Sequence, residues 1–490
     1  MQLNELKVVE FIEMVRKKKI SVEQVINDIF LHIDRIDQKL NAYLSTNKEG
    51  ALQEARKIDR MVKEGEKLPP LAGLPVAVKD IICTKGIETT CASRILQGFI
   101  PPYDATVIKK IKDAGAIIIG KTNMDEFGMG SSNENSAYQI TLNPWDTTRV
   151  PGGSSGGSAV AVAADEALAA LGTDTGGSVR LPASFCGVVG MKPTYGRVSR
   201  YGVIAYASSL DQVGTLTKSV SDAALMMNII CGYDEKDSTS AKIAVPDFLT
   251  SCQGNISNLK FGVPKEYFEK GLNAEVKEAV LKAIEKIADL GGKIEEVSLP
   301  NMQYALPAYY LIGMAEASSN LAKFDGIQYG LRIDENNDLE DMYKKTRTAG
   351  FGSEVIRRIM LGTYALSSGY YDAYYLKAQK VRTLIKKDFD EVFKKIDLIL
   401  CPTSPIPAFK IGEKIDDPLT MYLTDAYTMP VNLAGLPGLS INCDFTKNDN
   451  LPIGLQIIGR AFEEDKILRT AYNFETHFSS SDFKKPEIQV

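Results

Sequence analysis

The sequence predicts an α/β fold, and two observations support it. Short apolar runs of strand length alternate with longer segments whose apolar residues recur at helical spacing. The 490 residues are 44% hydrophobic and 24% charged, which is an ordinary globular composition with ample core. The length alone would suit about two to four domains, but composition does not shift at any point that would force a boundary.

The N-terminal part begins with helical patterns and continues into strands. Ser21-Val-Glu-Gln24 matches a capping box, so it opens the second helix. The apolar run ending at Lys79 and Asp80 has the length of a buried strand. Helices are predicted at Leu3–Lys18, from Ser21 onward, at about 49–65 and at Ala105–Asp113, and strands at Leu71–Asp80 and Ala116–Gly120.

The C-terminal part repeats the alternation around a long helical region rich in tyrosine. Strands are expected where short apolar runs lie between turn residues, and helices where an apolar face recurs. Helices are predicted at Asp222–Cys231, Asn273–Leu290, most of Tyr304–Lys395 and Glu464–Thr476, and strands at Leu259–Val263, Lys293–Leu299, Asp397–Cys401, Leu439–Cys443 and Ile453–Ile458.

The chain is organised around the stretch Pro151–Gly187, which holds two clusters of glycine and serine. The first is Gly152-Gly-Ser-Ser155 and the second is Gly176-Gly-Ser178. The run between them is rich in Ala, Val and Leu, and it has the length and composition of a buried helix of about three turns. We therefore expect the two loops at opposite ends of one rigid helix.

Three interpretations of this stretch differ in what they require. A flexible linker would not carry an embedded apolar helix. A phosphate-binding P-loop needs a Lys-Ser/Thr pair after its last glycine, and neither cluster has one. A nucleophilic serine fits the literal Gly-x-Ser-x-Gly at Gly152–Gly156, but such an elbow should follow an apolar strand, and Thr147–Pro151 precedes it here.

If a serine is the nucleophile, the hypotheses differ in which residue activates it. His32, in an early amphipathic segment, and His477, in the polar C-terminal tail, are the only histidines, and both are expected at the surface. A Ser-His-Asp triad using His477 stays open, since hydrolase triads can run in that chain order. Lys79 is the alternative, because a desolvated lysine also activates serine. On its segment alone, a solvated lysine just past a strand is the favoured interpretation.

Charge and cysteine content narrow the class of protein. The net charge is −5 and the pI is near 5.5, so the chain has no general electrostatic footprint for nucleic acid. Seven scattered cysteines without a CxxC motif favour reduced thiols in a cytoplasmic protein over disulfides or a zinc site. No apolar run has the length of a membrane span, and Glu5, Glu10 and Glu13 make the N-terminus unlike a targeting peptide.

Two motifs carry a resemblance to a known family. Gly-Gly-Ser-Ser-Gly-Gly-Ser from Gly152, followed by Gly172-Thr-Asp-Thr-Gly-Gly-Ser-Val-Arg180, resembles the signature of the amidase signature family, and Val-Ala-Val-Lys79-Asp matches the segment of its catalytic lysine. The resemblance implies a Ser-Ser-Lys triad. Ser178 would attack the amide carbonyl, Ser154, after a cis peptide bond, would relay the proton to Lys79, and the N–H groups of Thr175, Gly176 and Gly177 would form the oxyanion hole.

The resemblance also implies the architecture and covers nearly the whole chain. It implies one large domain over 1–490, with a central mixed β-sheet covered by helices on both faces. Within it, N-terminal helices would occupy 1–65, the signature core about 71–220, and a C-terminal part about 221–480.

Three further segments narrow the resemblance within the family. Pro307–Gly326, Arg357–Tyr375 and Asp417–Tyr422 are similar to the glutaminase subunits of tRNA-dependent amidotransferases. This implies that Tyr309, Arg358 and Asp425 hold glutamine. The chemistry agrees, because an arginine fork suits the carboxylate of a free amino acid and a carboxylate suits its ammonium. On sequence alone, two solvated arginines on a helix, Arg357 and Arg358, would be the favoured interpretation.

The function implied is hydrolysis of glutamine to glutamate and ammonia within a heterotrimer with partner subunits B and C. A partner would hold the mischarged tRNA, Glu-tRNA(Gln) or Asp-tRNA(Asn), and would use ATP and Mg²⁺, whereas this chain would need no cofactor and no metal. Two alternatives are a free-standing amidase acting on small amides and a phosphate-binding module built from the Gly/Ser loops.

Overall fold

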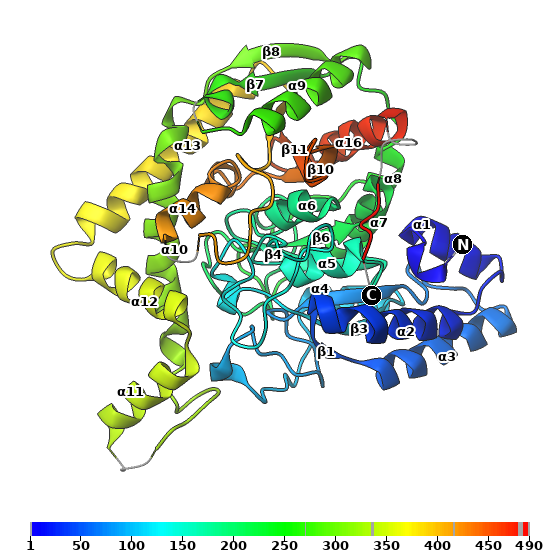
Figure 1. Ribbon diagram of the computed structural model, residues 1–490, viewed down its shortest axis with the longest axis horizontal. Coiled ribbons are helices and arrows are strands. Elements are labelled where there is room, and N and C mark those ends of the chain that lie inside the picture. Colours follow the sequence, from blue (N-terminus) through cyan, green and yellow to red (C-terminus); the bar gives the residue numbers. More distant parts are fainter. Residues whose placement is uncertain (1, 270, 335–337, 415–416, 479–483, 489–490) are drawn as a thin grey trace.

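The computed structural model describes residues 2–269, 271–334, 338–414, 417–478 and 484–488. Its centre is an 11-stranded sheet in the order β1-β3-β2-β4-β6-β5-β10-β11-β9-β7-β8 (Figure 1). Strand β2 runs parallel to β3 and β4, and β7 runs parallel to β8 and β9, whereas the other pairs are antiparallel. The predicted mixed sheet is therefore confirmed.

One sheet takes strands from both the signature core and the C-terminal part. The strands are β1 (Tyr43–Thr46), β2 (Pro75–Lys79), β3 (Ile117–Thr122), β4 (Ala169–Asp174), β5 (Val189–Lys192), β6 (Gln212–Thr217), β7 (Lys260–Pro264), β8 (Lys293–Val297), β9 (Leu398–Pro402), β10 (Gly438–Phe445) and β11 (Pro452–Gly459).

Helices cover both faces of the sheet, as predicted. Every residue of β2, β3, β4, β5, β6, β9 and β11 is buried, although successive side chains point to opposite faces. The helices of this cover are α1 (Val8–Arg16), α2 (Val22–Leu40), α3 (Lys48–Glu64), α4 (Thr106–Asp113), α5 (Gly156–Ala163), α6 (Arg180–Cys186), α7 (Val220–Ile230), α8 (Phe248–Ser251), α9 (Ala274–Asp289) and α16 (Glu464–Phe478).

A further layer of helices lies beside this core, along one flank of the molecule in Figure 1. Helix α10 packs against both α12 and α13 within this layer. Its helices are α10 (Ala305–Asn320), α11 (Leu339–Gly350), α12 (Ser353–Leu366) and α13 (Lys377–Val392), with α14 (Pro418–Tyr422), the 3-10 turn η8 (Leu423–Asp425) and α15 (Met429–Leu433) continuing towards the sheet.

The two edges of the sheet are short strands. Strand β1 is interrupted in its pairing with β3 between Tyr43 and Ser45. Strand β8 exposes Lys293, Glu295 and Glu296 to solvent, whereas its remaining residues are half-buried.

The prediction of one helix between the two Gly/Ser clusters was wrong. Helix α5 ends at Ala163, and the chain then turns and returns as β4 from Ala169. The turn passes through Asp165, which has a left-handed backbone with φ of 60°. Pattern alone could not separate these elements, because a fully buried helix and a fully buried strand are both continuous apolar runs.

Other elements differ from prediction mainly at their ends. The first helical pattern divides into a 3-10 turn, Leu3–Glu5, and α1, and Ser21 caps α2 by accepting a hydrogen bond from the Gln24 amide. Strands β1, β5 and β6 were not predicted. Strands β5 and β6 fall in a segment punctuated by Gly187, Gly196 and Gly202, and such breaks hide strand periodicity.

The structure places both histidines and all seven cysteines. His32 is half-buried and its Nε2 lies 2.8 Å from the Ala164 carbonyl oxygen, whereas His477 is exposed on α16. The cysteines, all within the described ranges, are free thiols. In those ranges no helix has both the length and the apolar run needed to cross a membrane, and no three His, Cys, Asp or Glu side chains are grouped as metal ligands.

Candidate active site

The ends of two parallel strands bring the sequence-predicted residues together. Lys79 is the last residue of β2, and Asp174 is the last residue of its neighbour β4. Carboxyl ends of adjacent parallel strands lie at one edge of a sheet, which is where ligands bind in open α/β folds. The loop carrying Ser154 precedes α5, and the turn carrying Ser178 follows β4.

Lys79 is fully buried and surrounded by hydroxyl groups. Its Nζ lies 2.7 Å from Ser154 Oγ, 2.9 Å from Ser155 Oγ and 2.9 Å from Thr173 Oγ1. In the described part of the chain Lys79 forms no ion pair with a carboxylate. Burial lowers the pKa of Lys79 to about 7, because the more distant carboxylates of Asp125, Asp174 and Asp211 compensate only in part.

The neutral amine fits this set of partners in detail. The Ser155 hydroxyl donates to the Thr173 carbonyl oxygen at 3.1 Å, so it can accept a hydrogen bond from Lys79. If Thr173 Oγ1 accepts the second N–H, the lone pair of a neutral amine is left for the Ser154 hydroxyl. The geometry can thus take a proton from Ser154.

The Ser154 loop rests on the segment that follows β3. The Gly153–Ser154 peptide bond is cis. The Gly153 amide donates to the Ser131 carbonyl oxygen at 2.8 Å, and the Asp125 amide donates to the Ser154 carbonyl oxygen at 3.3 Å. A Cβ on Gly153 would lie 2.0 Å from Asp125 Oδ2, so glycine permits this close approach. The loop is therefore fixed from both sides.

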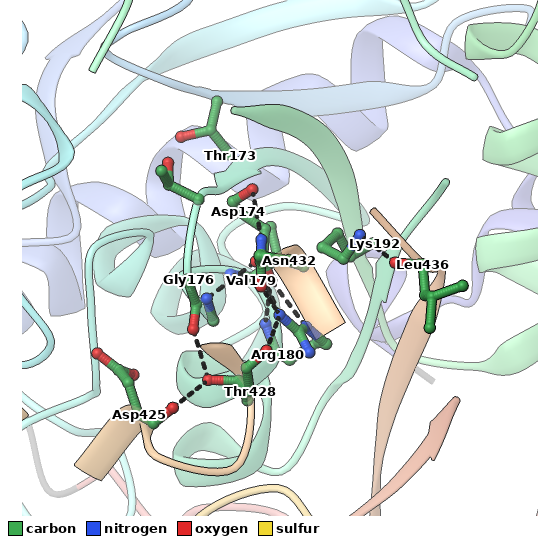
Figure 2. A network of polar contacts seen from close by, with 12 residues as sticks. Thr173, Asp174, Gly176, Val179, Arg180, Lys192, Asp425, Thr428, Asn432 and Leu436 are labelled. Carbon is green, nitrogen blue, oxygen red and sulfur yellow. Dashed lines mark hydrogen bonds and ion pairs between the residues drawn. The ribbon is translucent and has the colours of Figure 1, made fainter. Parts of the chain in front are cut away.

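The turn carrying Ser178 is folded around a buried ion pair, shown in Figure 2. Asp174 accepts hydrogen bonds from the Gly177 amide at 2.9 Å and from Arg180 Nε and Nη2, each at 3.0 Å. Asn432 also donates to Asp174 at 2.9 Å. Burial alone would raise the pKa of Asp174, but Arg180 holds it well below its ordinary value. The carboxylate thus fixes the turn.

The hydrogen bonds of this turn concern two interpretations of the sequence, the oxyanion hole and the phosphate-binding loop. Gly177 donates its amide to Asp174, whereas the amides of Thr175 and Gly176 donate no hydrogen bond within the described part of the chain. Two of the three predicted oxyanion donors are therefore available. In the second Gly/Ser cluster the Gly177 amide, followed by the Val179 amide, donates to the internal carboxylate of Asp174, whereas a phosphate-binding loop would offer such amides to its ligand.

The Ser154 loop and the Ser178 turn touch directly, since the Ser155 amide donates to the Ser178 carbonyl oxygen at 3.1 Å. Ser178 is 7% exposed, whereas Ser154 is 1% exposed. Ser178 is thus the one of the two predicted serines that offers more surface to a ligand, and Ser154 lies behind it against Lys79.

Tyr309, from α10, covers the same turn. A Cβ on Gly176 would lie 2.6 Å from the Tyr309 hydroxyl oxygen, so no other residue leaves room for this ring. Gly177 has φ of 145°, and a Cβ there would lie 2.2 Å from Thr428 Oγ1. Both glycines are therefore required by their neighbours.

Asp425, from η8, lies against the turn as well. A Cβ on Gly177 would be 3.2 Å from Asp425 Oδ1. The Ser131 hydroxyl donates to Asp425 Oδ2, whereas Oδ1 is buried and has no hydrogen-bond partner in the described part of the chain. Burial raises the pKa of Asp425 to about 8 despite the Ser131 hydrogen bond. A cation placed beside Oδ1 would satisfy it.

Arg358, from α12, is buried and stays charged. Its Nε donates to Glu354 Oε1 and its Nη1 donates to the Tyr206 hydroxyl, each at 2.8 Å. Burial alone would lower the pKa of Arg358, but Tyr206 and Glu354 raise it above its ordinary value. The solvated arginine that the sequence left open is excluded, because Arg358 is 3% exposed.

A cavity of about 260 Å³ opens beside these groups. The segment 130–137, the start of α12 and the end of α14 line it, with Glu354, Arg358 and Tyr422 among the lining residues. Glu126 also lines the cavity. It links the Ser93 segment to the start of α12, because it accepts hydrogen bonds from the Ser93 hydroxyl and, at 2.8 Å, from the Gly352 amide. The cavity thus lies between the segment 130–137 and the outer helices, on the side of Arg358, and the lining includes none of Lys79, Ser154 and Ser178.

Several residues of the site were not predicted from the sequence. Ser155 and Thr173 complete the surroundings of Lys79, and both lie inside the quoted motifs. Tyr206 and Glu354 hold Arg358, and Ser131 donates to Asp425. Ser131 lies in the segment after β3, Tyr206 lies between β5 and β6, and Glu354 lies just before the segment Arg357–Tyr375, so none of the three belongs to a motif quoted above.

Comparisons with known proteins agree with this geometry. The family model described as Amidase matches residues 24–468. A protein of Trichormus variabilis, named as the A subunit of glutamyl-tRNA(Gln) amidotransferase, is 57% identical, over 98% of this chain and 99% of the relative. The same-named protein of Moorella thermoacetica is 56% identical, over 100% of both chains.

Solved structures give the same picture. The crystal structure of the A subunit of glutamyl-tRNA(Gln) amidotransferase from Thermotoga maritima has a TM-score of 0.82 and 45% identity, and the match covers 100% of this chain and 99% of that chain. The native peptide amidase from Stenotrophomonas maltophilia has a TM-score of 0.84 at 27% identity, with 99% of both chains covered.

Proposed function

Since this chain belongs to the amidase family, we propose that it hydrolyses the side-chain amide of glutamine and supplies the ammonia to partner subunits of a tRNA-dependent amidotransferase. Its full-length relatives carry the name of one component of such an enzyme. The observation that carries the proposal is a pair of buried charged groups: Asp425 lies against Gly177 of the Ser178 turn, and Arg358 is held by Tyr206 and Glu354 on the side of the outer helices.

The amide bond is broken in two steps at Ser178. Its Oγ attacks the amide carbon while its proton passes to Ser154 Oγ, and the Ser154 proton passes to Lys79 Nζ. The amides of Thr175 and Gly176 stabilise the oxyanion. The nitrogen takes a proton back and leaves as ammonia, and water then hydrolyses the γ-glutamyl ester to glutamate.

The amino-acid end of glutamine is held by the outer helices. Arg358 binds the α-carboxylate, Asp425 Oδ1 accepts from the α-ammonium, and Tyr309 closes the site over Gly176. A free-standing amidase acting on simple amides has no use for a buried arginine and a buried carboxylate in these places. This pair therefore favours glutamine over small amides as the substrate.

Binding of tRNA and its activation with ATP and Mg²⁺ belong to partner subunits B and C. The net charge of −5 gives this chain no general attraction for phosphates. A glutaminase without an acceptor wastes glutamine, so the signal that tRNA is in place must reach Ser178 through the interface with these partners.

The test is glutamine hydrolysis by the chain alone and by the assembled complex. Hydrolysis by the complex should rise when ATP and mischarged tRNA are added, while the chain alone should respond to neither. The chain alone should also not retain tRNA at physiological salt. Full glutaminase or simple-amidase activity of the isolated chain, indifferent to partners and tRNA, would instead identify a free-standing amidase.

A further inference from the structure

Glu354 lies one helical turn before Arg358, on the same face of α12. Residues four apart on a helix meet at its surface, and a glutamate placed before an arginine is the favourable order. Here both side chains are buried, Glu354 being 7% exposed and Arg358 3% exposed. A carboxylate buried this deeply next to a guanidinium acts on the position of that guanidinium more than on overall stability.

Arg358 is held at two of its three nitrogens, which do not share an edge of the guanidinium. Glu354 Oε1 accepts from Nε–H, and the Tyr206 hydroxyl accepts from Nη1–H. Nη2, which forms the free edge, donates no hydrogen bond within the described ranges. A guanidinium carries five N–H donors in a fixed plane, so fixing Nε and Nη1 determines where the free edge at Nη2 points.

Glu354 is itself fixed by two neighbours. The Tyr422 hydroxyl donates to the same Oε1 at 2.7 Å, and Arg357 pairs with Oε2. The Tyr422 ring stacks on Tyr310 with centroids 3.9 Å apart, and the Arg358 guanidinium lies 5.3 Å from each of these two centroids. The Arg358 guanidinium therefore lies beside two stacked rings, and the hydroxyl of one of them, Tyr422, also holds the Glu354 carboxylate.

We propose that Glu354 is a positioning residue, which holds Arg358 so that its free edge receives the α-carboxylate of glutamine. The inference rests on the proposed function, because it concerns the same site. Glu354 touches no reacting atom, and it acts only through Arg358. It therefore governs the choice of substrate, free amino acid or plain amide, and leaves the amide chemistry unchanged.

The experiment measures steady-state kinetics of the assembled complex carrying Glu354→Gln. Glutamine keeps the size and one acceptor oxygen but loses the charge. The KM for glutamine should rise about tenfold, with kcat changed by less than about threefold, because ground-state and transition-state binding of the carboxylate weaken together. For 4-aminobutanamide, which is glutamine without its α-carboxylate, KM should not change.

Two further variants separate positioning from a structural role. Glu340→Gln removes the acidic partner of an exposed pair with Lys344 on α11, outside the site, and should leave both substrates unaffected. In an Arg358→Ala background, Glu354→Gln should add no further rise in KM, since a residue that acts through Arg358 cannot act without it.

The outcomes distinguish this inference from the proposed function. A parent complex that does not hydrolyse glutamine refutes the function. A working parent whose KM is unaffected by Glu354→Gln refutes the positioning role. Equal losses on glutamine and 4-aminobutanamide, or losses that persist in the Arg358→Ala background, also refute it, because a structural defect would act on both substrates.

Discussion

Lys79 and Arg358 are both buried cations, and the protein treats them in opposite ways. Around Lys79 the sheet and its loops supply hydroxyl groups and, among the described residues, no ion pair with a carboxylate, so burial lowers its pKa to about 7. Around Arg358, Glu354 of α12 supplies a carboxylate and Tyr206, between β5 and β6, supplies a hydroxyl, so its charge is retained. Burial alone therefore does not set the charge state of a basic side chain, because the groups in contact with it also determine its pKa.

The two surroundings also separate two tasks. The sheet side holds a base that exchanges protons near neutral pH, which suits proton transfer. The helical side holds a permanent charge in a fixed plane, which suits recognition of a carboxylate. Each task can be disturbed without the other, and the predictions below use that separation.

The largest effect is expected from removing the base. Lys79→Met keeps the length and the apolar stem but has no amine, so turnover should fall by about 10⁴-fold while the fold persists. The measurement is glutaminase activity of the assembled complex, with circular dichroism and thermal unfolding as controls for the fold. Substantial activity in a folded Lys79→Met protein would contradict the Ser-Ser-Lys mechanism and return attention to His477.

The next effect separates the two serines on the sheet side. Ser154→Ala removes the relay to Lys79 and keeps the nucleophile, so an activated glutamine analogue should label Ser178 about 10²-fold more slowly. Peptide mapping by mass spectrometry identifies the labelled residue, and Ser178→Ala serves as the unlabelled control. An adduct on Ser154 would reverse the two roles.

A smaller effect is expected on the helical side. Arg358→Lys keeps the charge but loses the planar fork, so the KM for glutamine should rise roughly 10- to 100-fold with a much smaller change in kcat. Initial rates over a range of glutamine concentrations give both constants. A fall in kcat with unchanged KM would mean that Arg358 serves the chemical step.

The smallest effect is the dependence on pH. The two sides should differ in the kinetic constant that changes and in the pH at which it changes. Lys79 must be neutral to accept a proton, so kcat should fall as pH falls through about 7. Asp425 must be ionised to hold the ammonium, so KM should fall as pH rises through about 8. Asp425→Asn should abolish the change of KM with pH and leave the pH profile of kcat as it is. A kcat that does not change between about pH 6 and 8 would argue against a lysine base.

Sequence reasoning went furthest where the site residues stand in recognisable short motifs. Lys79 at a strand end and the two Gly/Ser clusters stand in such motifs, the resemblance to a family implied that Lys79, Ser154 and Ser178 act together, and the structure brings their segments together. The intervening helix was wrong, because a buried helix and a buried strand share an apolar pattern. The domain subdivision at 65 and 220 stays a prediction, since one sheet spans both parts.

The helical side was less accessible to pattern analysis. Arg358 and Glu354 sit one turn apart, and that spacing also describes a solvated salt bridge on any helix surface. Tyr206 and Asp425 come from segments that lie far from α12 in sequence, so only the tertiary fold brings them to Arg358 and Gly177. Here the resemblance to a family named the residues, and the structure supplied the physical reason for them.

The exposed charges of β8 affect how molecules of this protein associate with one another. An open sheet of 11 strands ends in two unpaired edges, each a potential template for another chain. At one edge β1 is only 4 residues long, and at the other Lys293, Glu295 and Glu296 face solvent. A second β8 laid alongside would strip these charged side chains of water, which is costly. The edge thus resists edge-to-edge aggregation, which lets so wide a sheet stay open at the crowded protein concentrations of a cell.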